Sequence, residues 1–246
     1  MSSAKDGADV PFITTDQMRE VDRAMIEDYG ISLIQMMENA GRNLALLARR
    51  RFLNGNPTGR RVLVLAGTGG NGGGGPVCAR RLHNWGAYVD VLVTSQPDQF
   101  TEIPRHQLTI LQHMDISVGI AGEGLDLLPA DLIIDAIIGY SLQGAPTGPA
   151  ADLIRAANAH GAPTLALDVP SGVNTTTGSA FEPAIQATAT LTLALPKEGL
   201  RVEATKLRIG ELYLGDISVP PELYGRPPLD LKVANVFAQD EIVRLW

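Results

Sequence analysis

The stretch Gly67–Gly75, "GTGGNGGGG", joins two different sequence patterns. It follows "RVLVLA" at 61–66, a short apolar run typical of a strand buried on both faces of a parallel sheet. It precedes "PVCARRLHNWG" at 76–86, which has a helical pattern. Between a strand and a helix, glycines permit tight turns and let a ligand reach the amides of the helix N-terminus. We therefore predict a ligand-binding loop here, with Pro76 in the first turn of the following helix.

The rest of the chain extends this strand–helix alternation. Further short apolar runs predict strands at 87–94, 131–139, 163–172, 189–196 and 210–217. Helical patterns lie at 104–114 and 150–161, and two helices at 14–30 and 32–50 come first, each with a capping-box pair at its start. The order predicts one α/β domain over 1–246, with a mostly parallel sheet and a two-helix N-terminal arm. Its core spans about 13–220, and its tail 221–246 ends in either a small docked helix or the start of a further segment.

The composition excludes several classes of protein. With 20 basic and 27 acidic residues the net charge is −7, which argues against a nucleic-acid or anionic-membrane surface. The single cysteine, Cys78, rules out an intramolecular disulfide and fits a reducing compartment. No apolar run reaches the ~18 residues of a membrane span. The N-terminus lacks a signal-peptide or transit-peptide pattern, so we expect a cytoplasmic protein.

Two named nucleotide-binding motifs can be tested against the glycine stretch. A P-loop needs a Gly-Lys-Ser/Thr ending, which the stretch lacks. Gly67, Gly69 and Gly72 match G-x-G-x-x-G, but the dinucleotide-binding fold also needs an acidic residue at the tip of its second strand. The predicted second strand ends "VLVTSQ" instead. A standard nicotinamide dehydrogenase is therefore not favoured.

Polar residues gather where the predicted strands end. Asp135 and Asp168 each close an apolar run and open a glycine-containing loop, and Ser171 follows Asp168 by three residues. Because ligands bind outside the carboxyl ends of parallel strands, these oxygens and that of Asn71 suit a hard cation and a polar ligand. An aspartate at a strand end can also serve as a helix cap or turn former. Both interpretations stay open on these residues alone.

Five motifs occur in an order that resembles one family. They are "ITTDQMREVDRAMIEDYGISLIQMMENAGRNLA" from Ile13, "GTGGNGGGGPVCARRL" from Gly67, "DAIIGYSLQGAP" from Asp135, "LALDVPSGVNTTTG" from Leu165 and "LALPKEGL" from Leu193. The chain resembles the NAD(P)H-hydrate epimerases, the YjeF N-terminal family, from about Ile13 to Pro220. The resemblance implies a Rossmann-like three-layer αβα sandwich, a homodimer and a bound potassium ion. It also implies an isomerase of nicotinamide nucleotide repair, which interconverts the R and S forms of hydrated NADH and NADPH (NADHX and NADPHX) so that a dehydratase can repair both.

The resemblance also implies roles for individual residues. Asn71, Asp135 and Ser171 match the family's potassium ligands. Asp168 matches its ligand-binding acid and is our candidate acid/base. The remaining residues that match its substrate-binding segments, together with Asn71 and Asp168, are Gly70, Gly72, Gly73, Gly74, Gly139, Tyr140, Ser141, Leu142, Gln143 and Gly144.

The chain departs from the family in the glycine stretch. The family usually has Asn-Asn-Gly-Gly-Asp where this chain has Gly70-Asn71-Gly72-Gly73-Gly74, so an amide and a carboxylate are missing. One interpretation is an active epimerase. A second is a non-catalytic module of the same fold that binds a nucleotide or a protein, because Gly74 replaces the family's aspartate. A third is the epimerase part of a bifunctional repair enzyme.

Overall fold

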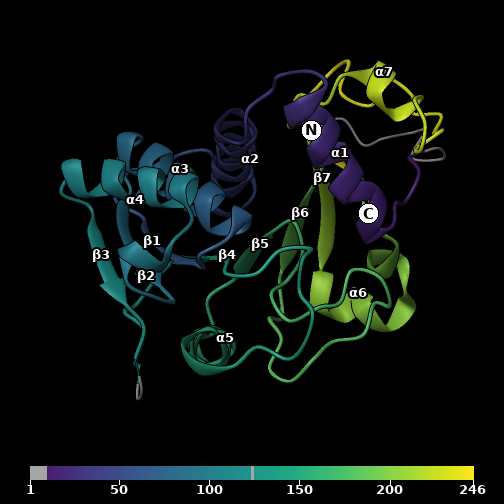
Figure 1. Cartoon of the computed structure of the whole chain (residues 1–246). Helices are drawn as coiled ribbons and strands as arrows, with labels where there is room; N and C mark the ends of the chain where they lie inside the picture. The colour runs from purple at the N-terminus through teal and green to yellow at the C-terminus, as the bar shows by residue number, and fades with distance from the viewer. Residues whose placement is uncertain (1–9, 123–124) are drawn as a thin grey trace.

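The centre of the fold is an eight-stranded sheet, seen in a computed structural model that describes residues 10–122 and 125–246 (Figure 1). The strands are β1 Arg61–Ala66, β2 Tyr88–Val93, β3 Ser117–Ile120, β4 Leu132–Ala136, β5 Thr164–Leu167, β6 Ala189–Leu193, β7 Glu211–Gly215 and β8 Ile242–Arg244. Their spatial order is β3-β2-β1-β4-β5-β6-β7-β8. Neighbouring strands from β3 to β7 are parallel, and β8 is antiparallel to β7. Residues 1–9 lie outside the described residues. They belong to the N-terminal stretch that lacks a signal-peptide pattern.

Helices cover both faces of this sheet. They are α1 Thr15–Glu27, α2 Leu33–Leu47, α3 Gly70–Asn84, α4 Glu102–His113, α5 Gly148–His160, α6 Glu203–Ile209 and α7 Pro221–Tyr224, with a π-helical turn η1 Ala48–Phe52 and 3-10 turns η2 Pro97–Gln99 and η3 Glu198–Arg201. Figure 1 shows α2, α3 and α4 on one face and α5 on the other. The predicted three-layer α/β class is therefore confirmed. Within the described part of the chain, no helix is long and apolar enough to cross a membrane.

The central strands carry core residues on both faces, which explains their continuous apolar runs. Along β1, Val62 and Val64 belong to the core under α2, α3 and α4, whereas Leu63 and Leu65 belong to the core around α5. Successive side chains of a strand point to opposite faces, so a strand between two helical layers needs apolar residues at every position.

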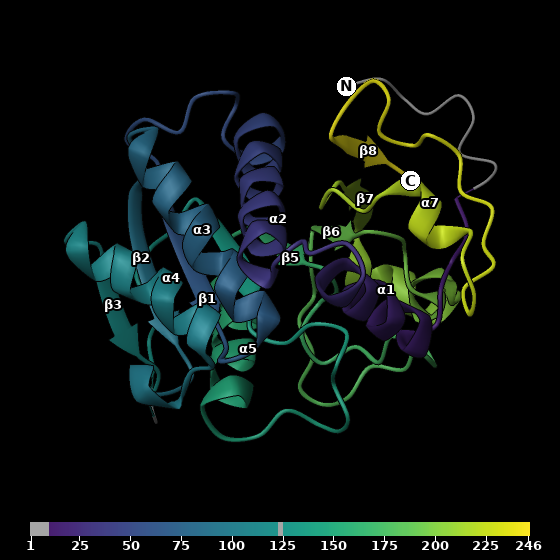
Figure 2. The same cartoon turned by 45° about the horizontal axis from the view of Figure 1, so that its top comes forward.

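The first two helices have different positions on the domain. The predicted capping box of α1 is present, because the Gln17 amide donates to Thr14 Oγ1 at 3.1 Å and Thr14 N–H donates to Gln17 Oε1 at 2.9 Å. Figure 2 shows α1 beside α7 and apart from the α2–α3–α4 layer. Helix α2 packs directly on α3: a Cβ added at Gly41 would lie 2.5 Å from the Gly74 carbonyl oxygen. Glu38 on α2 also accepts a hydrogen bond from Arg80 on α3 at 2.5 Å.

The glycine stretch differs from the prediction. Helix α3 begins at Gly70, so the predicted loop Gly70–Gly74 is the first part of this helix, and Pro76 is its seventh residue rather than part of its first turn. Glycine is a poor helix former, but tertiary packing overrides a weak local preference. Here the buried run Gly72–Gly75 packs against α2 and against the strands β1, β4 and β5.

The sequence does not predict the strands at the two edges of the sheet. The strand β3 was not anticipated; it is short and partly exposed. Of the two alternatives for the end of the tail 221–246, the small docked helix is wrong, since Ile242–Arg244 pairs with Tyr213–Gly215 as β8. A free edge of β7 offers unpaired backbone groups to this segment, which its own short apolar pattern does not reveal.

Candidate ligand-binding site

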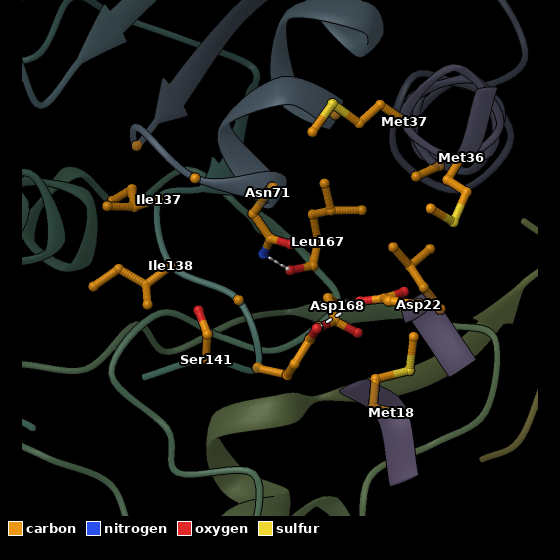
Figure 3. A pocket seen from close by; sticks show the side chains of 18 of the residues that line it. Met18, Asp22, Met36, Met37, Asn71, Ile137, Ile138, Ser141, Leu167 and Asp168 are labelled. Carbon is orange, nitrogen blue, oxygen red and sulfur yellow. Dashed lines mark hydrogen bonds between the residues drawn. The ribbon is translucent and has the colours of Figure 1, made fainter. Parts of the chain in front are cut away.

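A cavity of about 540 Å³ opens at the carboxyl ends of β1, β4 and β5 (Figure 3). The chain leaves β1 in one direction along the sheet, toward β2, and returns to β4 on the other side. Open α/β sheets bind ligands at such a reversal of strand order. The cavity is lined by Gly67–Asn71, Gly74, Thr94, Ile137–Ser141, Ala150, Leu167, Asp168, Leu193, Lys197 and Ile217, and by Met18, Asp22, Leu33, Met36, Met37 and Ala40 from α1 and α2.

The glycines of the stretch serve two different purposes. A Cβ added at Gly69 or Gly70 would meet open space, so these two positions are open toward the cavity that they line. A Cβ at Gly72 would collide with the Gly67 carbonyl oxygen, and one at Gly73 would collide with the Met37 sulfur. Gly72 and Gly73 are buried behind the lining and hold the helix close to its neighbours.

Gly74, where the family usually has aspartate, lines the cavity but has no free space beside it. A Cβ added there would lie 2.7 Å from Leu167 Cδ2. A residue larger than glycine at this position therefore requires the Leu167 side chain to move. At this point the cavity wall is apolar.

Asp168 occupies a tight turn directly after β5. Its φ is +67°, and Val169 N–H donates to the Leu167 carbonyl oxygen at 2.8 Å across it. The residue is 2% exposed. Its Oδ1 accepts a hydrogen bond from Lys197 Nζ at 2.5 Å, while Oδ2 has no hydrogen-bond partner among the described residues. A strained backbone and an unpartnered buried oxygen in a cavity wall are typical of a functional site rather than of a helix cap.

Lys197 is a site residue that the sequence analysis did not single out. Its side chain is fully buried, and Nζ also donates to the Leu193 carbonyl oxygen at 3.0 Å. Its backbone is held by Ile13, whose N–H donates to the Pro196 carbonyl oxygen at 2.8 Å and whose carbonyl oxygen accepts from Glu198 N–H at 2.9 Å. A lysine directly after the apolar run "LALP" was the available signal, because the carboxyl end of β6 lies beside that of β5.

Asp22 is a second residue that the sequence analysis missed. Tyr140 donates its hydroxyl to Asp22 Oδ2 at 2.5 Å, which ties the 139–144 segment to α1. Burial raises the pKa of Asp22, and the hydrogen bond from Tyr140 opposes that rise. Burial and the nearby carboxylate of Asp22 also raise the pKa of the Tyr140 hydroxyl.

The predicted ligand-binding segment after β4 lies only partly in the cavity wall. Gly139, Tyr140 and Ser141 line the cavity. The next three residues lie in the more exposed continuation of the segment and do not line the cavity; they are Leu142, Gln143 and Gly144.

The three predicted potassium ligands surround residues 137–139, a short segment that lines the cavity. Ser171 Oγ donates to Asp135 Oδ1 at 2.6 Å, and Ser171 N–H donates to Asp135 Oδ2 at 2.8 Å. Asn71 Nδ2 donates to the Leu167 carbonyl oxygen at 2.7 Å, and its Oδ1 lies against Gly139. The Ile138 amide of the same segment donates to Ser171 Oγ at 2.8 Å. The amide, carboxylate and hydroxyl oxygens thus come together around residues 137–139.

The charge of Asp135 makes this group chemically suited to a cation. The residue is fully buried, and burial raises the pKa of its carboxyl to about 6. Its hydrogen-bond donors are uncharged, and it forms no ion pair with the described side chains. The described residues contain no cluster of three or more His, Cys, Asp or Glu side chains that could hold a metal. A donor set of neutral oxygens and one carboxylate fits a monovalent cation, which needs less negative charge than a divalent one.

The fold and the cavity define a doubly wound α/β protein with a ligand site at its topological switch point. Comparison with known families gives a more specific assignment. The family described as YjeF-related protein N-terminus matches residues 33–199, and the chain belongs to this family.

Individual relatives agree with this assignment. The chain is 44% identical over 247 aligned residues to a Dehalogenimonas lykanthroporepellens protein named NAD(P)H-hydrate epimerase, covering 98% of this chain and 95% of the relative. It is 39% identical to a Moorella thermoacetica protein named bifunctional NAD(P)H-hydrate repair enzyme Nnr; that match covers 86% of this chain and 41% of the relative. The crystal structure of a yeast protein, YNL200c, superposes with a TM-score of 0.80 at 24% identity, over 96% of this chain and all of that one, and shows that the fold is shared.

Proposed function

We infer that this protein is an NAD(P)H-hydrate epimerase, which interconverts the R and S forms of hydrated NADH or NADPH. Relatives that bear this name match 98% and 87% of the chain, and the family match spans most of the segments that line the cavity, although not α1. The observation that carries the proposal is the carboxylate of Asp168 in the wall of the cavity of about 540 Å³, whose buried Oδ2 has no hydrogen-bond partner among the described residues. A base of this kind can exchange a proton with a hydroxyl group of a bound ligand.

The proposed reaction begins at the carboxylate of Asp168. Paired with the Lys197 ammonium, it is a carboxylate and acts first as a base. Oδ2 takes the proton of the C6 hydroxyl of the hydrated nicotinamide ring, a C6=O bond forms, and the C6–N1 bond breaks, leaving its electron pair on N1 and the conjugated carboxamide. After rotation about C5–C6, N1 attacks the other face of the aldehyde, and Asp168 returns the proton to the new C6 oxygen. Atoms and charge balance, and only the configuration at C6 changes.

Other parts of the cavity suit the rest of a nucleotide. The backbone amides at the start of α3, beside the open positions Gly69 and Gly70, form an anion site for a phosphate. Asn71, Tyr140 and Ser141 offer polar side chains at the cavity wall. The methionines Met18, Met36 and Met37 give an adaptable apolar surface for a ring. These contacts support a substrate with a polar and an apolar end.

We further propose that Asn71, Asp135 and Ser171 hold a potassium ion. The support is the convergence of three oxygen-bearing side chains around residues 137–139 and the buried charge of Asp135. A bound cation would neutralise that charge and brace the segment that carries Tyr140. It would supply no redox chemistry.

This potassium site predicts cation-dependent stability. Replacing tetramethylammonium chloride by KCl at equal ionic strength should raise the melting temperature, because a ligand that binds only the folded state stabilises it. At a hundredfold excess over the dissociation constant, the gain is about 2.7 kcal/mol, or roughly 5–10 °C for a chain of this size. Ser171→Ala should reduce this response. Equal melting temperatures in both salts would remove potassium from the proposal.

The remaining parts of the proposal concern partners and location. Bifunctional relatives carry this domain within a longer repair enzyme, of which the chain spans 41% in one case and 42% in another. This supports functional coupling to an NAD(P)HX dehydratase that consumes the S form. We also propose a homodimer in the cytoplasm, on the family resemblance and on the composition.

The experiment that tests the function measures epimerisation directly. Purified protein is mixed with R and S NADPHX and an S-specific dehydratase, and the reappearance of NADPH is followed beside a protein-free control. An epimerase converts the R form to the S form faster than occurs in the control, so that all of the substrate is recovered as NADPH. Rapid recovery of the S half alone would instead indicate a binding module that lacks the chemistry.

A further inference from the structure

The Lys197–Asp168 ion pair is the most deeply buried charged contact of the described structure. The two side chains are 0% and 3% exposed, and Nζ lies 2.5 Å from Oδ1. Burying two charges costs solvation energy that their attraction often fails to recover, so such a pair is weak evidence for stability. Both residues line the cavity, which points to a role there.

The geometry around the pair leaves one oxygen of the carboxylate without a hydrogen-bond partner. Lys197 Nζ and Thr192 Oγ1 both lie on the side of Oδ1, at 2.5 and 3.4 Å, while Oδ2 has no partner in the described part of the chain. The ammonium is itself held by the Leu193 carbonyl oxygen at 3.0 Å. The carboxylate therefore cannot turn freely, and its unpartnered oxygen is buried beside a backbone turn with a positive φ.

A second carboxylate, that of Asp22, lines the same cavity as Asp168. The carboxylate of Asp168 repels that of Asp22 and raises its pKa slightly, whereas the Lys197 ammonium lowers the pKa of Asp22 by more. Lys197 is the only cationic side chain among the residues that line the cavity within the described chain. Its positive charge offsets the repulsion between the two carboxylates.

We propose that Lys197 is the positioning residue of the reaction, which holds Oδ1 of Asp168 and thereby directs Oδ2 toward the C6 hydroxyl of the substrate. The inference rests on the proposed function and deepens it. Lys197 keeps its protons throughout, and the proton transferred in the reaction moves only between the C6 hydroxyl and Oδ2. Without the ammonium, the carboxylate is no longer held, and a displacement of about 1 Å can cost on the order of 100-fold in rate.

Lys197→Ala tests this role, because it removes the ammonium and leaves space for a small amine. We expect kcat for the R-to-S conversion to fall about 100-fold while KM changes less than threefold. Added propylammonium should restore at least a tenth of the lost rate, whereas tetramethylammonium, which has the charge but no N–H, should not. Lys206→Ala, on the exposed face of α6, is the matched control and should behave as the unmodified protein does.

Several outcomes would overturn the inference. One is a Lys197→Ala protein with nearly normal kcat. Another is a Lys197→Ala protein that folds but has a low kcat, which no primary amine restores. If Lys197→Ala does not fold, Lys197→Met fills the space without the charge; a low kcat with unchanged KM supports the role, and a raised KM with unchanged kcat contradicts it. If the unmodified protein itself fails to epimerise, the proposed function falls and this inference with it.

Discussion

Asp168→Asn should reduce kcat for epimerisation by roughly 10²- to 10⁴-fold, the usual contribution of a general acid or base. Asparagine keeps the shape of aspartate and can still accept a hydrogen bond from Lys197. Its amide nitrogen, placed where Oδ2 was, cannot take a proton from the C6 hydroxyl. KM should change little, because the cavity wall keeps its shape. The coupled NADPH assay measures both constants.

This variant needs a stability control, since it leaves the Lys197 ammonium buried without a counter-ion. Breaking a buried pair on one side typically costs about 3–5 kcal/mol, whereas replacing both members is often neutral. Thermal unfolding of Asp168→Asn should therefore be compared with that of the double variant Asp168→Asn/Lys197→Met, which restores folding if charge is the cause. An Asp168→Asn protein that keeps activity within tenfold of the original would remove Asp168 from the acid/base role.

Gly72→Ala should cost about 3 kcal/mol of stability, the upper end of what an added methyl group costs in a packed core. The new Cβ would collide with the Gly67 carbonyl oxygen, which is backbone and cannot swing aside as a side chain can. For a chain of this size the loss corresponds to roughly 6–12 °C in melting temperature. Epimerase activity should fall as well, because Gly67 lines the cavity.

Gly70→Ala is the matched control for this prediction. It lies in the same turn of α3, but its added Cβ meets open space. Its stability should stay unchanged or rise by about 0.4–1 kcal/mol, as expected when alanine replaces an unstrained glycine. Equal losses in the two variants would show that the glycines matter for chain flexibility and not for close packing.

The fold could be predicted from the sequence because its elements have strong local patterns. The apolar runs of β1, β4 and β5 are continuous because both faces of these strands are covered, and the helices between them have a clear period. The two missed strands, β3 and β8, are short edge strands of four and three residues. Their pairing depends on a neighbouring strand edge, which no local pattern records.

The candidate site could be predicted only in part. Asp135 and Asp168 were found because each closes a strong strand, and the structure places those strands side by side. Lys197 and Asp22 were missed, since a single lysine and a helical aspartate look like ordinary surface residues. They enter the site through the β6 end and through α1, which lie 29 and 146 residues from Asp168 in the chain.

The glycine stretch shows where local information ends. Its composition alone predicts a backbone that passes close to a neighbouring group, because glycine, which has no Cβ, permits such an approach. Whether that neighbour is a ligand or the protein itself depends on what other segments bring to each position. Gly69 and Gly70 face open space at the cavity, whereas Gly72 and Gly73 meet Gly67 and Met37. The sequence determines which positions lack a Cβ atom. The packing of β1, α2 and β5 around α3 determines beside which of these glycines there is space for a substrate.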